Sequence, residues 1–215
     1  MRARLVGGVI AAATAALLAA GCSDSGTAPP AAAPASAPSP ARTAAAPISP
    51  EHNQSDVVFV QGMIPHHQQA VAMSSQAPDR ASSPEVKALA ARIDREQAPE
   101  IEQMNRMLDA WGAPRPQPGS TAMPGMPGVP GMTTGDMAMH GMMSDAQMQQ
   151  LAAQSGASFD RMFLQMMIEH HTGAVQMAQT EQGQGLNPQA EELAGGIAAA
   201  QQQEITEMQA LLSRV

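Results

Sequence analysis

Aromatic residues, cysteine and basic residues are all scarce in this chain. Its 215 residues include no tyrosine, one tryptophan, three phenylalanines and one cysteine. A core must therefore be built from aliphatic residues and methionine, which is abundant at 18 residues. A single cysteine excludes an intrachain disulfide. The net charge of -8 at pH 7 argues against nucleic acid as a partner, because that binding depends on Lys and Arg.

The first 22 residues are typical of an export signal. Arg2 and Arg4 precede an apolar stretch at residues 5–20, and small residues follow before Cys22. The stretch is shorter than the ~20 residues that a membrane-spanning helix needs. We expect residues 1–22 to be a lipoprotein-type signal with the lipid on Cys22, so that the protein is extracytoplasmic and anchored to the membrane. The alternative is an ordinary signal peptide and a secreted protein.

Composition divides the remaining chain into four segments. Residues 23–52 are rich in Ala and Pro and are expected to be a disordered tether, because they bury too little apolar surface to fold. Residues 53–112 and 144–215 show the periodicity of amphipathic helices. Residues 113–143 are rich in Met, Pro and Gly and are expected to be a flexible linker.

The two periodic segments repeat one another at a constant offset of 104 residues. Identical residues at this offset include Phe59 and Phe163, His66 and His170, His67 and His171, and Glu100 and Glu204. Each copy contains two helical stretches separated by a short break. Two such hairpins can bury their apolar stripes against each other, so the repeat predicts one all-α domain, a four-helix bundle with pseudo-twofold symmetry.

Local signals place the ends of the helices. Ser83, Pro84 and the acid that follows them are typical of a helix start, and Gly112 is expected to end that helix. Pro65 and Pro99 lie inside two proposed helices and remove backbone donors there. We therefore expect local bends in the first copy, whereas the second copy has Glu and Gln at these positions.

The first helix of each copy carries a Met-x-x-His-His cluster. At about 100° per residue, Asp56, Met63 and His67 lie near the centre of the apolar stripe, and His66 lies to one side near Met73. The candidate metal ligands are Met63, His66, His67, Met73, Met167, His170, His171 and Met177. Further candidates are Asp56, Asp160, and the acids that interrupt the apolar face of the second helix, Glu100 and Glu204.

The chemistry of these side chains predicts which metal ion they hold. Thioether sulfur is a soft ligand that prefers Cu(I), and Ag(I) by analogy, while imidazole suits copper, zinc, iron and nickel. Methionine with histidine and no thiolate therefore favours copper, as Cu(I). The alternative is a buried network in which His, Asp and Glu satisfy one another without a metal, because unpartnered polar groups are costly to bury.

Methionine is also concentrated in the linker. Its C-terminal part contains Met137, Met139, His140, Met142 and Met143. Pro and Gly disfavour a packed core here, so core filling does not explain these methionines. They predict a flexible strand that binds a soft metal ion, with drift in a low-complexity segment as the alternative.

Residues 56–67, Asp-Val-Val-Phe-Val-Gln-Gly-Met-Ile-Pro-His-His, resemble the domain of unknown function 305 family, and residues 160–171 resemble its other half. The resemblance extends over roughly residues 53–212. It implies a ferritin-like four-helix fold in bacterial proteins that are usually exported. It also implies that some members bind copper through Met and His, without a settled activity for the family.

The resulting hypothesis is a non-enzymatic protein that sequesters copper or hands it over. The ferritin-like fold raises an alternative, a carboxylate and histidine di-metal oxidoreductase. That chemistry uses a Glu-x-x-His motif on each of two helices, and the chain contains no such motif. A structural bundle with a buried polar network is the other alternative.

Overall fold

The computed structural model describes residues 47–116 and 140–215. The expectations for the export signal, Cys22 and the tether up to residue 46 lie outside the described residues. The same holds for linker residues 117–139, which include Met137 and Met139.

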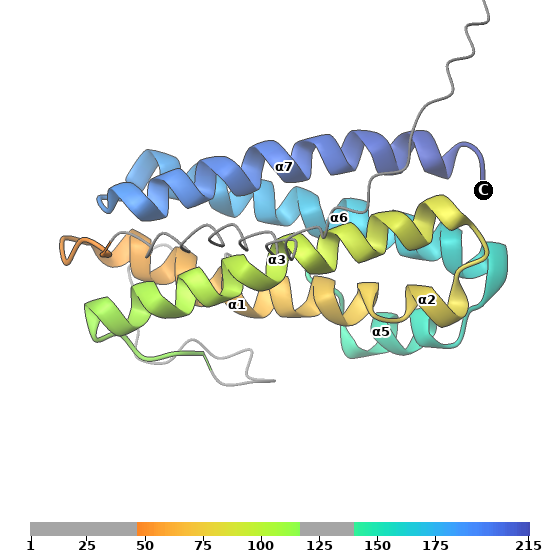
Figure 1. The fold of residues 1–215 in the computed structure, drawn as a ribbon, viewed down its shortest axis with the longest axis horizontal. Coiled ribbons are helices and arrows are strands. Elements are labelled where there is room, and N and C mark those ends of the chain that lie inside the picture. The colour runs from red at the N-terminus through yellow and green to blue at the C-terminus, as the bar shows by residue number, and fades with distance from the viewer. Residues whose placement is uncertain (1–46, 117–139) are drawn as a thin grey trace, which may run out of the picture. The chain divides into compact units, whose positions relative to one another are not determined.

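The described residues form an all-helical structure, shown in Figure 1. The helices are α1 (Gln54–Ser74), α2 (Ala77–Arg80), α3 (Pro84–Trp111), α5 (Asp145–Ala152), α6 (Gly156–Gln184) and α7 (Pro188–Leu212). Helix α1 packs along α3 and α6 packs along α7, and the contact between α1 and α6 joins the two hairpins. The expected all-α bundle of repeated hairpins is confirmed.

The predicted start and end of α3 are both observed. The Ser83 hydroxyl accepts a hydrogen bond from the Val86 amide at 3.3 Å and caps α3, with proline at the first helical position. Gly112 ends α3 with a positive φ of 64°, a conformation that glycine adopts without strain. Helices α1 and α3 continue through Pro65 and Pro99.

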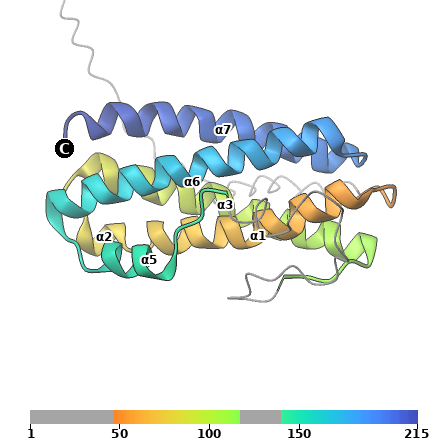
Figure 2. The same cartoon turned by 180° about the vertical axis from the view of Figure 1, so that it is seen from behind.

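Two short helices were not foreseen from the sequence. Helix α2 occupies the break between α1 and α3, and α5 precedes α6 and lies beside α1 in Figure 2. Both are too short to show a helical period. Ser144 and Gln147 form a capping box that starts α5. Within the two described ranges, no helix has both the length and the apolar character needed to cross a membrane.

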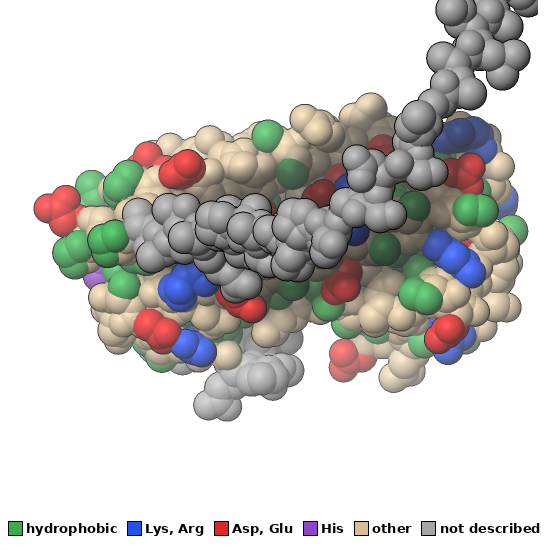
Figure 3. Space-filling model, viewed as in Figure 1, with side chains coloured by type: hydrophobic (Ala, Val, Ile, Leu, Met, Phe, Trp, Pro, Cys, Tyr) green, Lys and Arg blue, Asp and Glu red, His purple; other side chains and the backbone are tan. Residues whose placement is uncertain are grey.

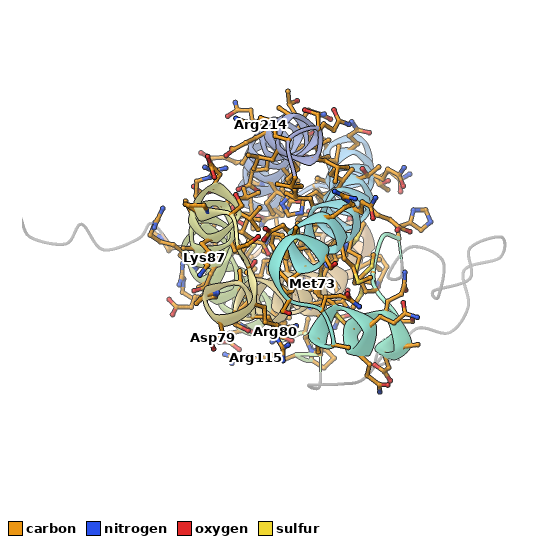
Figure 4. All side chains as sticks on the ribbon, turned by 90° about the vertical axis from the view of Figure 1, so that its right-hand side faces the viewer. Met73, Asp79, Arg80, Lys87, Arg115 and Arg214 are labelled. Carbon is orange, nitrogen blue, oxygen red and sulfur yellow. The ribbon has the colours of Figure 1, made fainter. Side chains whose placement is uncertain are left out.

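The apolar core consists of two clusters separated along α1 by the histidines. One cluster includes Phe59 and Met63 with Met177, and the other includes Met73 with Met167. The end-on view of Figure 4 shows Met73 between the helices, while Lys87 and Arg214 lie at the periphery. Methionine therefore fills much of the core of a chain that has few aromatic residues.

An aspartate from each hairpin caps a helix of the other hairpin. Asp56 on α1 accepts hydrogen bonds from the amides of Leu186 at 3.1 Å and Asn187 at 2.9 Å, at the start of α7. Asp160 on α6 accepts from the amides of Ser82 at 3.1 Å and Ser83 at 2.9 Å, at the start of α3. A negative charge is favourable at a helix N-terminus, so both aspartates fasten the hairpins together.

A second carboxyl group lies against one of these caps. Glu181 on α6 is fully buried, and its Oε2 accepts from the Ser55 hydroxyl at 3.0 Å. Burial, followed by the hydrogen bond to Asp56, raises the pKa of Glu181 to about 8. Burial alone would raise the pKa of Asp56 too, but hydrogen bonds from Glu181 and the backbone lower it. Glu181 is thus protonated at neutral pH beside an ionised Asp56.

Replacing the Asp160 cap should destabilise the fold. In Asp160→Ala, the partly buried amides of Ser82 and Ser83 at the start of α3 lose their acceptor, and the free energy of unfolding should fall by roughly 0.5–2 kcal/mol, as for the loss of a helix cap. Urea denaturation measures the change. Asp94→Ala, at an exposed position of α3, is the control and should change it by less than about 0.5 kcal/mol. Equal effects of the two variants would contradict the capping role.

The raised pKa of Glu181 predicts how stability depends on pH. Between about pH 6.5 and 8 the folded chain holds a proton on Glu181 that the unfolded chain has released, so stability falls as pH rises. The contribution is about 1.4 kcal/mol per pH unit. Denaturation of Glu181→Gln should lack this decline, whereas Glu169→Gln, at an exposed position of α6, should retain it. A decline of the same size in Glu181→Gln would refute the assignment.

Candidate metal centre

All four histidines of the repeated clusters lie in the interior of the bundle. His66, His67, His170 and His171 have no exposed surface. In agreement with this, almost no histidine is visible on the face shown in Figure 3, where acidic and basic side chains are interspersed. The helical wheel predicted a central position for His67 and His171 alone. The structure buries the flanking His66 and His170 as fully, because α6 covers that side of α1.

The flanking histidines of the two copies meet each other. The ring centroids of His66 and His170 are 3.8 Å apart, with an angle of 42° between the rings. These residues correspond in the repeat, so the pseudo-twofold axis passes between them. The Met-x-x-His-His clusters of the two copies therefore adjoin each other at the contact of α1 with α6.

The central histidines each bind a carboxylate on the neighbouring helix. His67 Nε2 lies 2.8 Å from Glu100 Oε2, and His171 Nε2 lies 2.8 Å from Glu204 Oε2. An ionised carboxylate only accepts hydrogen bonds, so Nε2 carries the proton in both rings. Nδ1 is then left with its lone pair, and in both residues it is buried without a hydrogen-bond partner.

Burial lowers the pKa of three of the four imidazoles and so favours their neutral form. Burial, and then the proximity of His67, lower the pKa of His66 to about 3. Burial and then the neighbouring His66 hold the pKa of His170 well below its usual range. Burial also lowers the pKa of His171, although Glu204 opposes the shift. A neutral imidazole retains a lone pair, which is the form that binds a metal ion.

The interior of the bundle contains several polar atoms that lack partners. On the core histidines and on two glutamines they are His66 Nδ1, His67 Nδ1, both ring nitrogens of His170, His171 Nδ1, both amide atoms of Gln97, and Gln201 Oε1. Ser74 Oγ, Gln76 Oε1 and Glu181 Oε1 also lack a partner. Gln97 and Gln201 each precede a histidine-bound glutamate by three residues, so they share its helix face. Leaving one such atom unsatisfied costs about 1–3 kcal/mol, so a concentration of them needs an explanation.

The predicted methionines are buried near the histidines. Met63, Met73 and Met167 have no exposed surface, and Met177 is 7% exposed. The apolar clusters pair Met63 with Met177 and Met73 with Met167, so each cluster contains methionines from both copies. Within residues 47–116 and 140–215, no three His, Cys, Asp or Glu side chains are arranged as a metal site.

Not all the predicted acids are close to the histidines. Glu100 and Glu204 bind His67 and His171, whereas Asp56 and Asp160 lie at the ends of the bundle as helix caps. Asp56 precedes His67 by eleven residues on α1, which corresponds to about 16 Å along the helix. A helical wheel shows which side of a helix a residue occupies and hides this axial separation.

The two histidine–glutamate pairs have different surroundings. Glu204 Oε1 lies 3.5 Å from Arg92 Nε, and Arg92 also binds Glu207. The position that corresponds to Arg92 in the second copy is Gly196, so the symmetric cation is missing there. The Glu204 side chain is 7% exposed and that of Glu100 is 26% exposed. The pair in the first hairpin is therefore the more accessible to solvent.

The end of the Met-rich linker also reaches the histidines. His140 is exposed, but its carbonyl oxygen accepts a hydrogen bond from His66 Nε2 at 3.0 Å. Met142 is partly buried, and Met143 is buried in an apolar cluster. Sequence reasoning treated this segment as flexible and missed the docking, because the contact is made by a backbone carbonyl that no side-chain pattern reveals.

The fold and the site define a helical bundle built from a duplicated hairpin, with neutral histidines in its core. Residues 56–212 match the family described as Domain of unknown function (DUF305). The chain belongs to this family. A comparison with curated proteins finds no significant match.

Solved structures of the same family resemble the chain closely. A DUF305 protein of Streptomyces coelicolor, described as secreted, is 35% identical, with a TM-score of 0.64 over 74% of this chain and 93% of that one. A DUF305 fragment from Deinococcus radiodurans is 33% identical, with a TM-score of 0.63 over 76% and 98%. CopM in its Cu(II)-bound form is 33% identical, with a TM-score of 0.59 over 74% and 96%. CopM has also been solved with Cu(I) and with Ag.

Proposed function

We propose that this chain binds copper at the histidines and methionines inside the bundle, and that it sequesters the ion or hands it over. The observation that carries the proposal is the set of buried, neutral imidazoles with unpartnered nitrogens. A hydrogen-bond network without metal accounts for the His–Glu pairs, but it leaves these nitrogens unexplained.

The His–Glu pairs have the arrangement that supports a metal ligand. A ligating histidine commonly donates its second ring N–H to a carboxylate, which fixes the orientation of the ring and raises its basicity. Glu100 and Glu204 accept this hydrogen bond from His67 and His171. Nδ1 of both rings would then bind the ion.

The choice of copper rests on the remaining donors. His66 and His170 lie together, and the thioethers of Met63, Met73, Met167 and Met177 are buried in the adjoining clusters. Thioether with imidazole favours Cu(I) over harder ions. The copper-bound and silver-bound forms of the similar CopM support this choice.

We also propose that the protein is exported and anchored to the membrane. The basic and apolar N-terminal residues support export, as does the similarity to a protein described as secreted. A lipid on Cys22 would hold the bundle at the membrane surface. The methionines of the linker would collect Cu(I) near the site, and no catalytic role is assigned to the chain.

The direct test replaces the histidines. Under competition with a Cu(I) chelator, the wild-type chain should bind Cu(I), and His66→Ala/His67→Ala/His170→Ala/His171→Ala should lose the tightest binding. Circular dichroism shows whether the fourfold variant remains helical. If it does not fold, the double variant His66→Ala/His170→Ala takes its place in the assay. His52→Ala, outside the core, is the control. Binding that is equally tight in the histidine variants would exclude this site.

The carboxylate that supports His67 can be tested separately. Glu100→Gln retains the size of the side chain but removes the charge that orients the imidazole. We expect Cu(I) affinity to fall by roughly 10- to 100-fold, as for other outer-shell partners of metal ligands. Glu102→Gln, at an exposed position of the same helix, should leave the affinity unchanged. The same competition assay measures both, and equal affinities would show that Glu100 does not support a ligand.

A further inference from the structure

Residues 140–143, which precede α5, form a short segment that we call the strap. The strap lies across α1 and α6 (Figure 2). His66 Nε2 donates to the carbonyl oxygen of His140 at 3.0 Å. Gln69, one turn further along α1, binds the strap twice. Its Nε2 donates to the Met143 carbonyl at 2.7 Å, and its Oε1 accepts from the Met143 amide at 2.7 Å. The strap is therefore fastened to α1 beside the histidine pair.

The strap is also fitted to α6. His140 Nδ1 donates to Gln176 Oε1 at 2.9 Å. A Cβ atom at Gly173 would overlap the His140 carbonyl, which is the group that binds His66. Gly141 has a positive φ of 76°, and a Cβ there would lie 2.5 Å from the Glu169 carbonyl. Both glycines are therefore required for the close approach of the two backbones.

The two copies of the repeat differ where the strap docks. At the offset of 104 residues, Gln69 corresponds to Gly173, and Gln176 corresponds to Ala72. The first copy supplies the amide of Gln69, and the second copy supplies the amide of Gln176 and omits, at Gly173, a side chain that would block the strap. These differences between α1 and α6 thus involve residues that contact the strap.

We propose that the strap is a positioning element of the metal centre. The His140 carbonyl accepts only from an N–H, so it holds His66 in the tautomer with the proton on Nε2. The buried Nδ1 of His66 is then presented to the ion with its lone pair. This inference rests on the proposed copper binding. Because the strap is the C-terminal end of the Met-rich linker, its docking would bring that end to the ligands in the core.

Displacing the strap in the full chain tests this role. Gly173→Ala should push the His140 carbonyl away from His66. In metal-free protein, ¹⁵N NMR should show the Nε2–H tautomer of His66 in the wild type and a mixture in the variant. Amide hydrogen exchange of residues 140–143 should be faster in the variant. Affinity for Ag(I), the probe ion, should fall by roughly 10- to 100-fold. Gly183→Ala on α6, where a Cβ meets no atom within 4 Å, is the matched control and should change none of these.

A second variant covers the case in which Gly173→Ala disturbs α6 itself. Gln69→Leu removes both hydrogen bonds between α1 and Met143. It should change the His66 tautomer, the amide exchange of the strap and the Ag(I) affinity in the same way as Gly173→Ala. Combining it with His66→Ala should cause no further loss of affinity, because both changes act through one ring. The positioning role is overturned if both strap variants change tautomer and exchange but bind Ag(I) as tightly as the wild type. Absence of Ag(I) binding by the wild type would instead overturn the proposed function.

Discussion

The structure depends on the burial of four imidazoles at the contact between two copies of one hairpin. Burial without a countercharge favours the neutral form of histidine, and a neutral ring needs a partner for its N–H or a ligand for its lone pair. Glu100, Glu204 and the His140 carbonyl meet the first need for three of the rings. The second need is not met by protein atoms at Nδ1 of these rings. A metal ion bound as proposed would meet this second need.

The arrangement also explains how a bundle with few aromatic residues holds its hairpins together. Apolar clusters rich in methionine lie on both sides of the histidines, and Asp56 and Asp160 cap helices of the opposite hairpin at the ends of the bundle. Polar contacts thus define the register of α1 against α6, while apolar packing supplies most of the burial. A shift of one helical turn would separate His66 from His170 and break both caps.

Much of this could be predicted from the sequence, because duplication supplies information that a single copy lacks. The repeat indicated the hairpins, the bundle and the equivalence of His66 and His170, and residue types suggested the ends of α3. The axial position of Asp56 could not be predicted from a wheel, which projects all turns onto one circle. The roles of Gly173 and Gln69 were also hidden, because they depend on a backbone segment docked from elsewhere in the chain.

Departures from symmetry give the two halves different properties. Arg92 compensates the charge of Glu204, whereas Glu100 is more exposed, and the strap docks on Gln69 of one copy and Gly173 of the other. An ion held near the pseudo-twofold axis would therefore be more accessible to solvent from the side of Glu100 than from the side of Glu204. Such asymmetry would suit the proposed uptake and release of a copper ion.

X-ray absorption at the copper edge of the Cu(I)-loaded chain tests the central claim most directly, because it identifies the donor atoms. The account predicts both imidazole nitrogen and thioether sulfur around the ion, with the nitrogen contribution lost in the variant that lacks the four core histidines. A coordination shell of sulfur alone, unchanged in that variant, would place the copper outside the bundle core and contradict the account.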